Sequence, residues 1–234
     1  MLDILGVELD ATLGGIEPGS LIIANHISWL DIFVLNAARP VAFISKSEVR
    51  DWPLIGWLSA KTDTVFLRRG SRGHAKIVNA EIDALLNAGK DVALFPEGTT
   101  TDGTTLLGFH AALLQPAVET GHPVQPVALS YETPDGRRTL APAYAGETTM
   151  GQCVGAILAT PKMIARLRPT PALATTDNTG NATRREIARA AHAAIALSLG
   201  LPPANNRPET PAGLPAEPPS DGAPRDSLNP AQAA

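Results

Sequence analysis

A histidine and an aspartate five positions apart directly follow an apolar run near the start of the chain. The run is SLIIA at 20–24, and His26 and Asp31 come after it. On one straight helix, side chains five positions apart point about 140° away from each other, so this pair cannot share a helix face. If His26 lies in a loop and Ser28 caps the helix, Asp31 in the first turn can fold back toward the imidazole. An imidazole held by a carboxylate is suited to remove a proton from a hydroxyl group.

The same segment also fits a purely structural interpretation. Ser28 and Asp31 have the spacing of a helix capping box, and a histidine at the end of a strand is commonly structural. On this segment alone, the catalytic and the structural interpretations both remain open.

A second polar turn follows a predicted strand at 91–95 and reads Pro96-Glu97-Gly98-Thr99. The proline prevents normal strand pairing, and the glycine permits a tight turn. We expect Glu97 and the threonine hydroxyls to point out of the sheet edge, where they could hold a polyol or a phosphate group. A plain strand-to-loop turn is the alternative.

Three arginines, Arg68, Arg69 and Arg72, follow the predicted strand at 64–67 and are flanked by glycines. Guanidinium groups bind phosphate through two parallel hydrogen bonds, so this basic loop in an acidic protein is a candidate anion site. A solvated charged turn is the alternative.

These segments need elements to position them, and the chain alternates short apolar runs with helical patterns. The helical pattern at 74–88 stops at Gly89, and the one at 182–199 opens with a capping box of Thr183 and Glu186. Such alternation favours an α/β fold with a mainly parallel central sheet flanked by helices, where chemistry gathers at the carboxyl ends of strands. The expected strands are 20–24, 41–45, 64–67, 91–95 and 124–130.

Three segments add detail to this scheme. Residues 1–19 read as a fragment of helix or strand followed by a Gly/Pro loop. Pro126 in the strand at 124–130 cannot donate to a sheet ladder, which indicates a strand near an edge or against a packing wall. Residues 201–234 hold nine of the 21 prolines and almost no large apolar residues, which predicts a disordered tail after a folded domain at 1–200.

The composition excludes several classes of protein. The 234 residues, 44% of them hydrophobic, suffice for one domain with a real core. One cysteine rules out a disulfide scaffold and a cysteine-based zinc site, and a net charge of −4 argues against nucleic acid as a partner. No apolar run approaches the roughly 18–20 residues of a spanning helix, and no signal peptide is visible. We therefore expect a soluble or membrane-surface protein of the cytoplasm.

Read in order, these segments resemble the phospholipid/glycerol acyltransferase family, which contains the bacterial 1-acylglycerol-3-phosphate acyltransferases. That family has H-x-x-x-x-D, an arginine after an apolar strand, F-P-E-G-T and a V-x-P-V-like strand. All four blocks occur here in that order, and the resemblance covers roughly residues 4–131. It implies transfer of an acyl group from acyl-CoA or acyl-carrier protein to a lysolipid hydroxyl, with no metal, no cofactor and no covalent acyl-enzyme.

The resemblance also implies a role for each matching residue. His26 would be the base that deprotonates the acceptor hydroxyl, and Asp31 would orient it. The substrate-binding positions would be Arg69 for the acceptor's anionic head group, Glu97, Gly98 and Thr99 for the acceptor, and Pro126 on the acyl-donor side.

Two departures from the family pattern concern the acceptor. Thr100 stands where the family often has arginine, and Phe109-His110 replaces a Phe-Lys pair. The resulting E-G-T-T-x-D-G form resembles a subgroup that includes lyso-ornithine lipid acyltransferases, which is the alternative to lysophosphatidate as acceptor. A non-catalytic lipid-binding member is a second alternative, although His26, Asp31 and Glu97 are all present. A serine hydrolase ranks last, because the chain has no G-x-S-x-G.

The resemblance also implies N-terminal membrane-binding helices, which this sequence does not show, so either the natural protein starts further upstream or surface contacts anchor the enzyme. The candidates for such surface contact are Trp29 and the stretch WPLIGWL at 52–58, since tryptophans favour the lipid interface. For the stretch at 52–58, burial in the core is the equal alternative. We expect a peripheral enzyme on the cytoplasmic face of the inner membrane.

Overall fold

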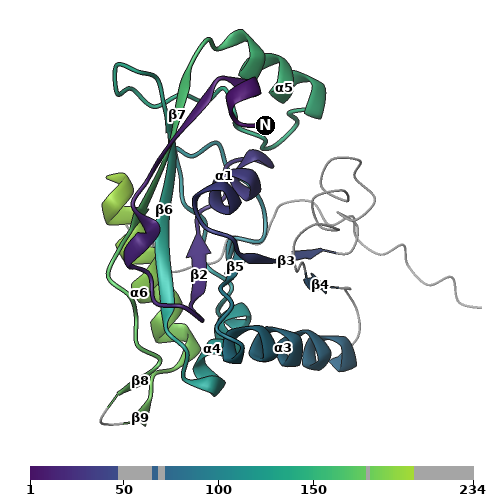
Figure 1. Cartoon of the computed structure of the whole chain (residues 1–234), viewed down its shortest axis with the longest axis vertical. Coiled ribbons are helices and arrows are strands. Elements are labelled where there is room, and N and C mark those ends of the chain that lie inside the picture. Colours follow the sequence, from purple (N-terminus) through teal and green to yellow (C-terminus); the bar gives the residue numbers. More distant parts are fainter. Residues whose placement is uncertain (47–64, 68–71, 178–179, 203–234) are drawn as a thin grey trace, which may run out of the picture.

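Figure 1 shows the chain as a computed structural model, in which residues 1–46, 65–67, 72–177 and 180–202 are described. This part of the chain contains a seven-stranded sheet in the order β1-β7-β6-β2-β5-β3-β4 and a small hairpin of β8 and β9. The strands are β1 (Val7–Ala11), β2 (Leu21–Ala24), β3 (Ala42–Lys46), β4 (Val65–Leu67), β5 (Val92–Leu94), β6 (Val124–Glu132), β7 (Met163–Pro169), β8 (Thr176–Asp177) and β9 (Gly180–Asn181). The helices are η1 (Asp3–Leu5), η2 (Leu13–Gly15), α1 (Leu30–Ala38), α3 (Arg72–Asn87), η4 (Ala111–Leu114), α4 (Gln115–Thr120), α5 (Met150–Ala159) and α6 (Arg184–Leu199).

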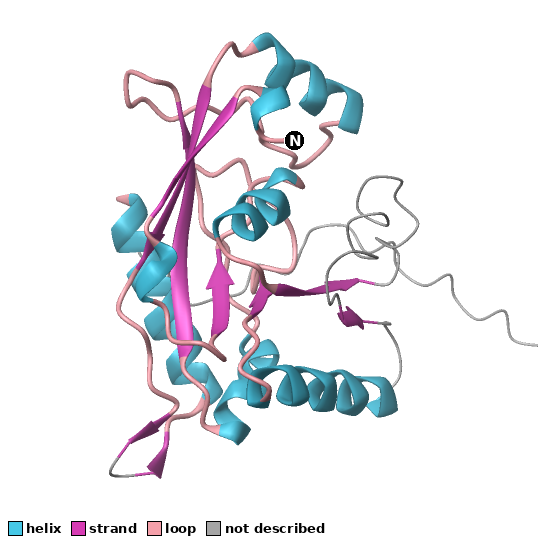
Figure 2. Ribbon diagram, in the orientation of Figure 1, coloured by secondary structure: helices cyan, strands magenta, loops and turns pink. Residues whose placement is uncertain are grey.

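Neighbouring strands of the large sheet run parallel at every pairing except one. Only β6 and β7 pair antiparallel, with Val127 opposite Pro169. The expected mainly parallel sheet flanked by helices is confirmed, and Figure 2 shows the helices on both sides of it.

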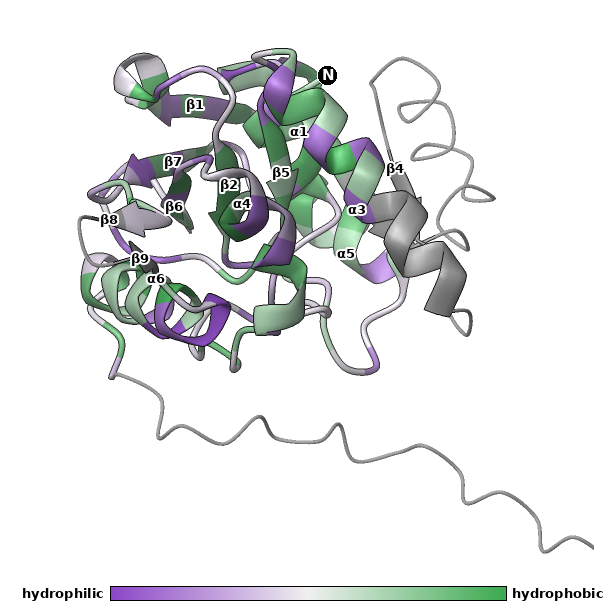
Figure 3. Cartoon of the chain, turned by 90° about the horizontal axis from the view of Figure 1, so that it is seen from below, coloured by the Kyte–Doolittle hydropathy of each residue, from purple (hydrophilic) through white to green (hydrophobic). Residues whose placement is uncertain are grey.

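The sheet is buried on both faces, and β2 shows how. Ile22 and Ala24 pack in one core with residues of α1 and α5, whereas Leu21 and Ile23 pack in a second core with residues of α3, α4 and α6. Successive residues of a strand point to opposite faces, so an unbroken apolar run is what a doubly covered strand requires. Figure 3 accordingly shows β2 and β5 as hydrophobic strands in the interior.

The last helix, α6, forms where the capping pattern predicts it. The Thr183 hydroxyl accepts from the backbone N–H of Glu186, and the Glu186 carboxylate accepts from the backbone N–H of Thr183. The helix ends at Gly200, which takes the left-handed conformation that glycine adopts without strain.

Residues 1–19, read as a fragment of helix or strand, contain η1, β1 and η2. The sequence analysis did not predict α4, the hairpin of β8 and β9, or the pair α5 and β7. Two signals for the latter pair are present: Thr149 and Gln152 form a capping box at the start of α5, and buried and partly exposed residues alternate along β7.

The proline of β6 does not place that strand at an edge, because β6 lies inside the sheet between β7 and β2. Pro126 lies where the pairing with β7 ends, and its carbonyl accepts the backbone N–H of Thr170 at 3.0 Å. The amide hydrogen that proline lacks is replaced by the Gln125 side chain, whose Nε2 donates to the Thr170 carbonyl at 2.6 Å. A neighbouring side chain therefore makes an internal proline tolerable.

Several expectations concern residues outside the described ones. These are Arg68 and Arg69, the WPLIGWL stretch at 52–58, and the tail from residue 203 onward. Trp29 is described, and the expectation that it contacts a membrane is wrong, because its side chain is buried in the core. None of the helices in the described part of the chain combines the length and apolar character needed to cross a bilayer.

Candidate active site

The candidate site lies at the carboxyl edge of the parallel strands. The strands β2 and β5 pair in parallel, so the segments that follow them, 25–29 and 95–101, leave the sheet at the same edge. The side chain of Asn25 fixes the first segment to β6: its Nδ2 donates to the Leu129 carbonyl at 2.9 Å, and its Oδ1 accepts the Leu129 N–H at 2.8 Å.

His26 and Asp31 are in contact. The distance from His26 Nδ1 to Asp31 Oδ2 is 2.9 Å, and the side chain of Asp31 is 0% exposed. The same oxygen accepts the backbone N–H groups of Ile27 at 2.7 Å and Ser28 at 2.9 Å. Asp31 therefore both closes the turn before α1 and holds the histidine. The expected capping box is only half formed, because the N-cap of α1 is Trp29 and the Ser28 hydroxyl accepts the N–H of Leu30 instead of that of Asp31.

The imidazole of His26 is fixed on its flat side as well. It stacks on the Phe95 ring with centroids 3.9 Å apart and planes 7° from parallel. Because the carboxylate can only accept, Nδ1 carries the hydrogen in the neutral ring, and Nε2 on the far side bears the lone pair. The His26 side chain is 18% exposed, so the imidazole is partly accessible.

The second oxygen of Asp31 binds a residue that the sequence analysis did not single out. Tyr131, near the end of β6, donates its hydroxyl to Asp31 Oδ1 at 2.7 Å, and its side chain is buried. Burial, with the Asp31 charge as the second cause, raises the pKa of Tyr131 well above its ordinary value. The available signal was its position at the carboxyl end of a predicted strand.

Glu97 does not point out of the sheet edge as expected. Its side chain is buried, Oε1 accepts the His26 N–H at 2.8 Å, and Oε2 accepts the Leu107 N–H at 2.8 Å. Burial raises the pKa of Glu97 to about 7, against the lowering effect of these two hydrogen bonds. Glu97 thus joins the histidine segment to the loop at 102–110 rather than presenting a free carboxylate.

The remaining residues of this turn support the histidine segment from the other side. Gly98 has a φ of +72°, and a side chain there would meet the His110 ring at 3.1 Å, so glycine is required. Thr99 is exposed, whereas Thr101 is buried and its N–H donates to the His26 carbonyl at 2.8 Å. The structure therefore brings together His26, Asp31 and Glu97, with Thr99 at the surface.

Two of the expected substrate-binding residues are not part of this cluster. Arg69 lies outside the described residues, so its role stays a prediction. Pro126 is buried in β6 opposite Ile23, and its expected link to the acyl donor also stays a prediction. Among the described residues, no group of three or more His, Cys, Asp or Glu side chains could hold a metal ion.

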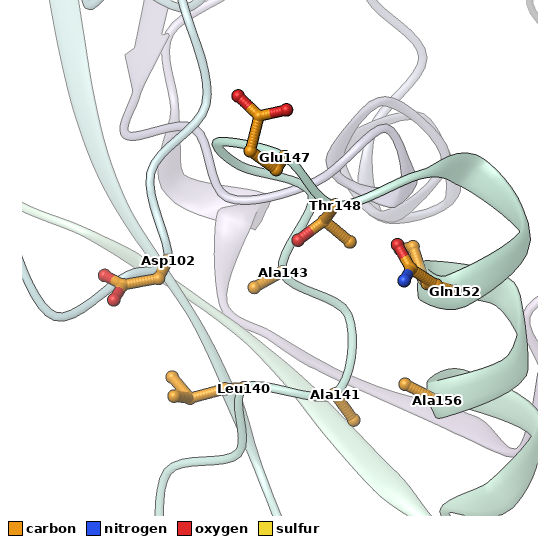
Figure 4. A pocket seen from close by; sticks show the side chains of 9 residues that line it. Asp102, Leu140, Ala141, Ala143, Glu147, Thr148, Gln152 and Ala156 are labelled. Atoms are coloured by element: carbon orange, nitrogen blue, oxygen red, sulfur yellow. The ribbon is translucent and has the colours of Figure 1, made fainter.

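A cavity of about 570 Å³ lies between the loop at 140–148 and α5, and none of residues 25–31 lines it. In Figure 4, Asp102 and the loop at 140–148 lie on one side of it, and Gln152 and Ala156 of α5 lie on the other. Hydrogen bonds join its wall to the site, since the Tyr144 N–H donates to the Ile27 carbonyl at 2.9 Å. Its lining combines the apolar side chains of Leu140, Ala141, Ala143, Cys153 and Ala156 with the polar ones of Asp102, Glu147, Thr148 and Gln152.

Comparison with known proteins identifies the family of this chain. The sequence model of the acyltransferase family matches residues 12–130, which include the histidine pair, the Glu97 turn and Pro126. The chain belongs to the acyltransferase family. It is 40% identical over 180 residues to a lyso-ornithine lipid O-acyltransferase of Pseudomonas aeruginosa, covering 76% of this chain and 66% of that protein.

Other relatives of this acyltransferase chain carry a different name. A 1-acyl-sn-glycerol-3-phosphate acyltransferase of Neisseria meningitidis is 39% identical over 163 residues, covering 70% of this chain and 64% of that protein. The chain thus spans slightly less than two thirds of the length of these two relatives. The structure of the Thermotoga maritima 1-acyl-sn-glycerophosphate acyltransferase PlsC shares the fold, with a TM-score of 0.61 and 22% identity over 85% of this chain and 73% of that one.

Proposed function

We propose that this chain is an O-acyltransferase that moves a fatty acyl group from a thioester donor to the hydroxyl of a lysolipid, a step of phospholipid or related lipid biosynthesis. The contact between His26 Nδ1 and the buried Asp31 carboxylate carries this proposal. It is the arrangement of a general base, and it lies in the segment that matches the acyltransferase family.

The proposed reaction is a direct transfer. His26 Nε2 takes the proton of the acceptor hydroxyl as the hydroxyl oxygen attacks the thioester carbonyl. The tetrahedral intermediate then collapses, the carbon–sulfur bond breaks, and the imidazolium returns the proton to the departing thiolate. The products are the acylated lipid and the free thiol, and Asp31 stabilises the positive imidazolium between the two proton transfers.

The donor in this proposal is acyl-CoA or acyl-carrier protein, without a metal or a cofactor. The acceptor is a lysolipid such as 1-acylglycerol-3-phosphate or a lyso-ornithine lipid. The second is favoured by a specific observation: Thr100, Asp102 and Gly103 give the E-G-T-T-x-D-G form, and His110 stands in place of a lysine. Relatives of nearly equal identity carry each of the two names.

The proposed place of action is a membrane surface. Lysolipids reside in bilayers, so we propose that the enzyme binds peripherally at the cytoplasmic face of the inner membrane, where thioester donors are made. The alternative of a non-catalytic lipid-binding protein is disfavoured by the described site, in which His26, Asp31 and Glu97 keep their mutual contacts.

An acyl-transfer assay read by mass spectrometry tests the proposal. Wild type, His26→Ala and His122→Ala are each offered acyl-CoA or acyl-carrier protein with lysophosphatidate and lyso-ornithine lipid together. We expect one acylated product from the wild type and from His122→Ala, whose histidine lies two residues before β6, and a loss of about 10²–10⁴-fold in His26→Ala. No product with any pair of substrates, or full turnover in His26→Ala, contradicts the proposal.

A further inference from the structure

The Asp31 carboxylate receives its hydrogen bonds from two different parts of the fold. Oδ2 accepts from His26, Ile27 and Ser28, which all lie within five positions of it. Oδ1 accepts from Tyr131, which comes from β6 and lies 100 positions away in the sequence. The tertiary structure alone therefore determines how the second oxygen is bound.

We propose that Tyr131 is a positioning residue that sets the basicity of His26 by donating its hydroxyl to Asp31. The consequence for catalysis rests on the proposed function, whereas the effect on the imidazole does not. The hydroxyl contacts neither the imidazole nor the solvent, since it is buried and its hydrogen bond is to the far oxygen of the carboxylate.

The direction of the effect follows from charge. Each donor to a carboxylate stabilises its anionic form and disperses its negative charge. Without the Tyr131 hydroxyl, more charge remains on Asp31 to stabilise the imidazolium form of His26. The titration midpoint of the His26 imidazole is then expected to rise.

Few other titratable groups face this pair in the described structure. Glu97 accepts the backbone N–H of His26, and Cys153 on α5 lies close enough to Asp31 and Tyr131 for their charges to interact. Burial raises the pKa of the Cys153 thiol, and the Tyr131 hydroxyl also keeps its proton, so both remain neutral near pH 7. Among the described groups that face this pair, Glu97 has a pKa of about 7, and it is unchanged in both variants.

The test compares the imidazole titration of wild type, Tyr131→Phe and Thr175→Val by NMR on the full chain labelled at histidine. The His26 signal is assigned with His26→Gln. Tyr131→Phe removes the hydroxyl and keeps the ring, and its His26 midpoint is expected to rise by about half a pH unit or more. Thr175→Val also removes a buried hydroxyl that donates to a backbone carbonyl, that of His122, and it is expected to leave the midpoint unchanged.

A second substitution keeps the proposal testable if Tyr131→Phe does not fold. A fluorinated tyrosine at position 131 has a more acidic phenol and donates more strongly, so it is expected to lower the His26 midpoint. A midpoint that stays constant in both variants, or that moves against these directions, overturns the proposal.

Kinetics separate this proposal from the proposed function. If acyl transfer occurs, Tyr131→Phe is expected to lower kcat about threefold at pH values below the imidazole midpoint, with little change in the acceptor KM, and to move the acid limb of the pH profile to higher pH with that midpoint. A uniform loss of activity at all pH values, without movement of that limb, shows a merely structural role and overturns the proposal. If no acyl transfer occurs but the midpoints move as expected, the proposed function fails and the role of Tyr131 stands.

Discussion

At the scale of single residues, the Asp31 carboxylate both closes the turn before α1 and holds His26. The sequence analysis treated these two roles as alternatives. One carboxylate receives four hydrogen bonds and leaves neither oxygen unpaired, although the side chain is fully buried. A buried carboxylate is tolerated when hydrogen-bond donors compensate its charge. Here the same donors also close a turn and fix the position of a histidine.

The Asp31→Asn substitution separates charge from geometry. The asparagine oxygen can still accept from His26 and the turn, and its amide can donate to the Tyr131 oxygen, so the fold is expected to persist. The imidazolium loses its counter-charge, so kcat for acyl transfer is expected to fall by about 10²–10⁴-fold. Steady-state kinetics with circular dichroism as a control for folding test this, and activity within about threefold of the wild type would contradict it.

Glu97 makes stability depend on pH. Its pKa of about 7 in the folded protein lies above its ordinary value of 4.5, so the folded state binds a proton more tightly than the unfolded state. The contribution to stability is therefore full below about pH 4.5 and is lost as the pH rises through about 7, with an upper limit of roughly 3 kcal/mol.

Glu97→Gln removes this titration. Urea unfolding between pH 4.5 and 8 is expected to show that the free energy of unfolding of the wild type falls, relative to that of the variant, as the pH rises. A difference between the two proteins that is constant across this range would show that Glu97 does not titrate there.

At the scale of elements, β6 serves both the sheet and the site. Its first half carries Pro126 and ends the pairing with β7, and its last residues bring Tyr131 to the Asp31 carboxylate. Between them, Leu129 binds the side chain of Asn25. A shift in the register of β6 would thus alter the site as well as the core.

The pairing at Pro126 predicts a coupled effect of two substitutions. Gln125→Leu leaves the Thr170 carbonyl without its side-chain donor and is expected to cost about 1–3 kcal/mol of unfolding free energy. In a Pro126→Ala background a backbone N–H returns beside this carbonyl, so Gln125→Leu is expected to cost less. A double-mutant cycle from urea unfolding measures the coupling, and additive effects would contradict this account.

At the scale of the whole molecule, the sheet needs helices on both faces, and α6 helps to cover one of these faces. The buried residues of this helix include Ile187, Ala191 and Ile195. A strand such as β2, apolar on both faces, could not remain exposed on either.

Two truncated chains are expected to differ in unfolding free energy and so to show where the folded unit ends. A chain that stops after Pro202 is expected to keep its unfolding free energy within about 0.5 kcal/mol, because the composition beyond it cannot form a core. A chain that stops after Ala194 loses the buried Ile195, Ala196 and Leu199 and is expected to lose more than about 3 kcal/mol. Equal stability of the two truncated chains, measured by urea unfolding, would contradict this division.

The sequence by itself determined those features that depend on neighbours along the chain. These are the apolar run of β2, the capping box and glycine stop of α6, and the contact between His26 and Asp31 across one turn. Each is local, because hydrogen bonds and periodicity within a few residues suffice to define it. The order of the four motifs added the resemblance to the acyltransferase family.

Only the tertiary structure decided where polar side chains at the sheet edge point. Glu97 turns inward because His26 and Leu107, on different segments, both present backbone N–H groups to it. Tyr131 joins the site because β6 pairs beside β2, and Pro126 is tolerated inside the sheet because Gln125 reaches Thr170. A side chain at the end of a strand takes its direction from the donors and acceptors that other elements bring to it, and a local pattern does not contain them.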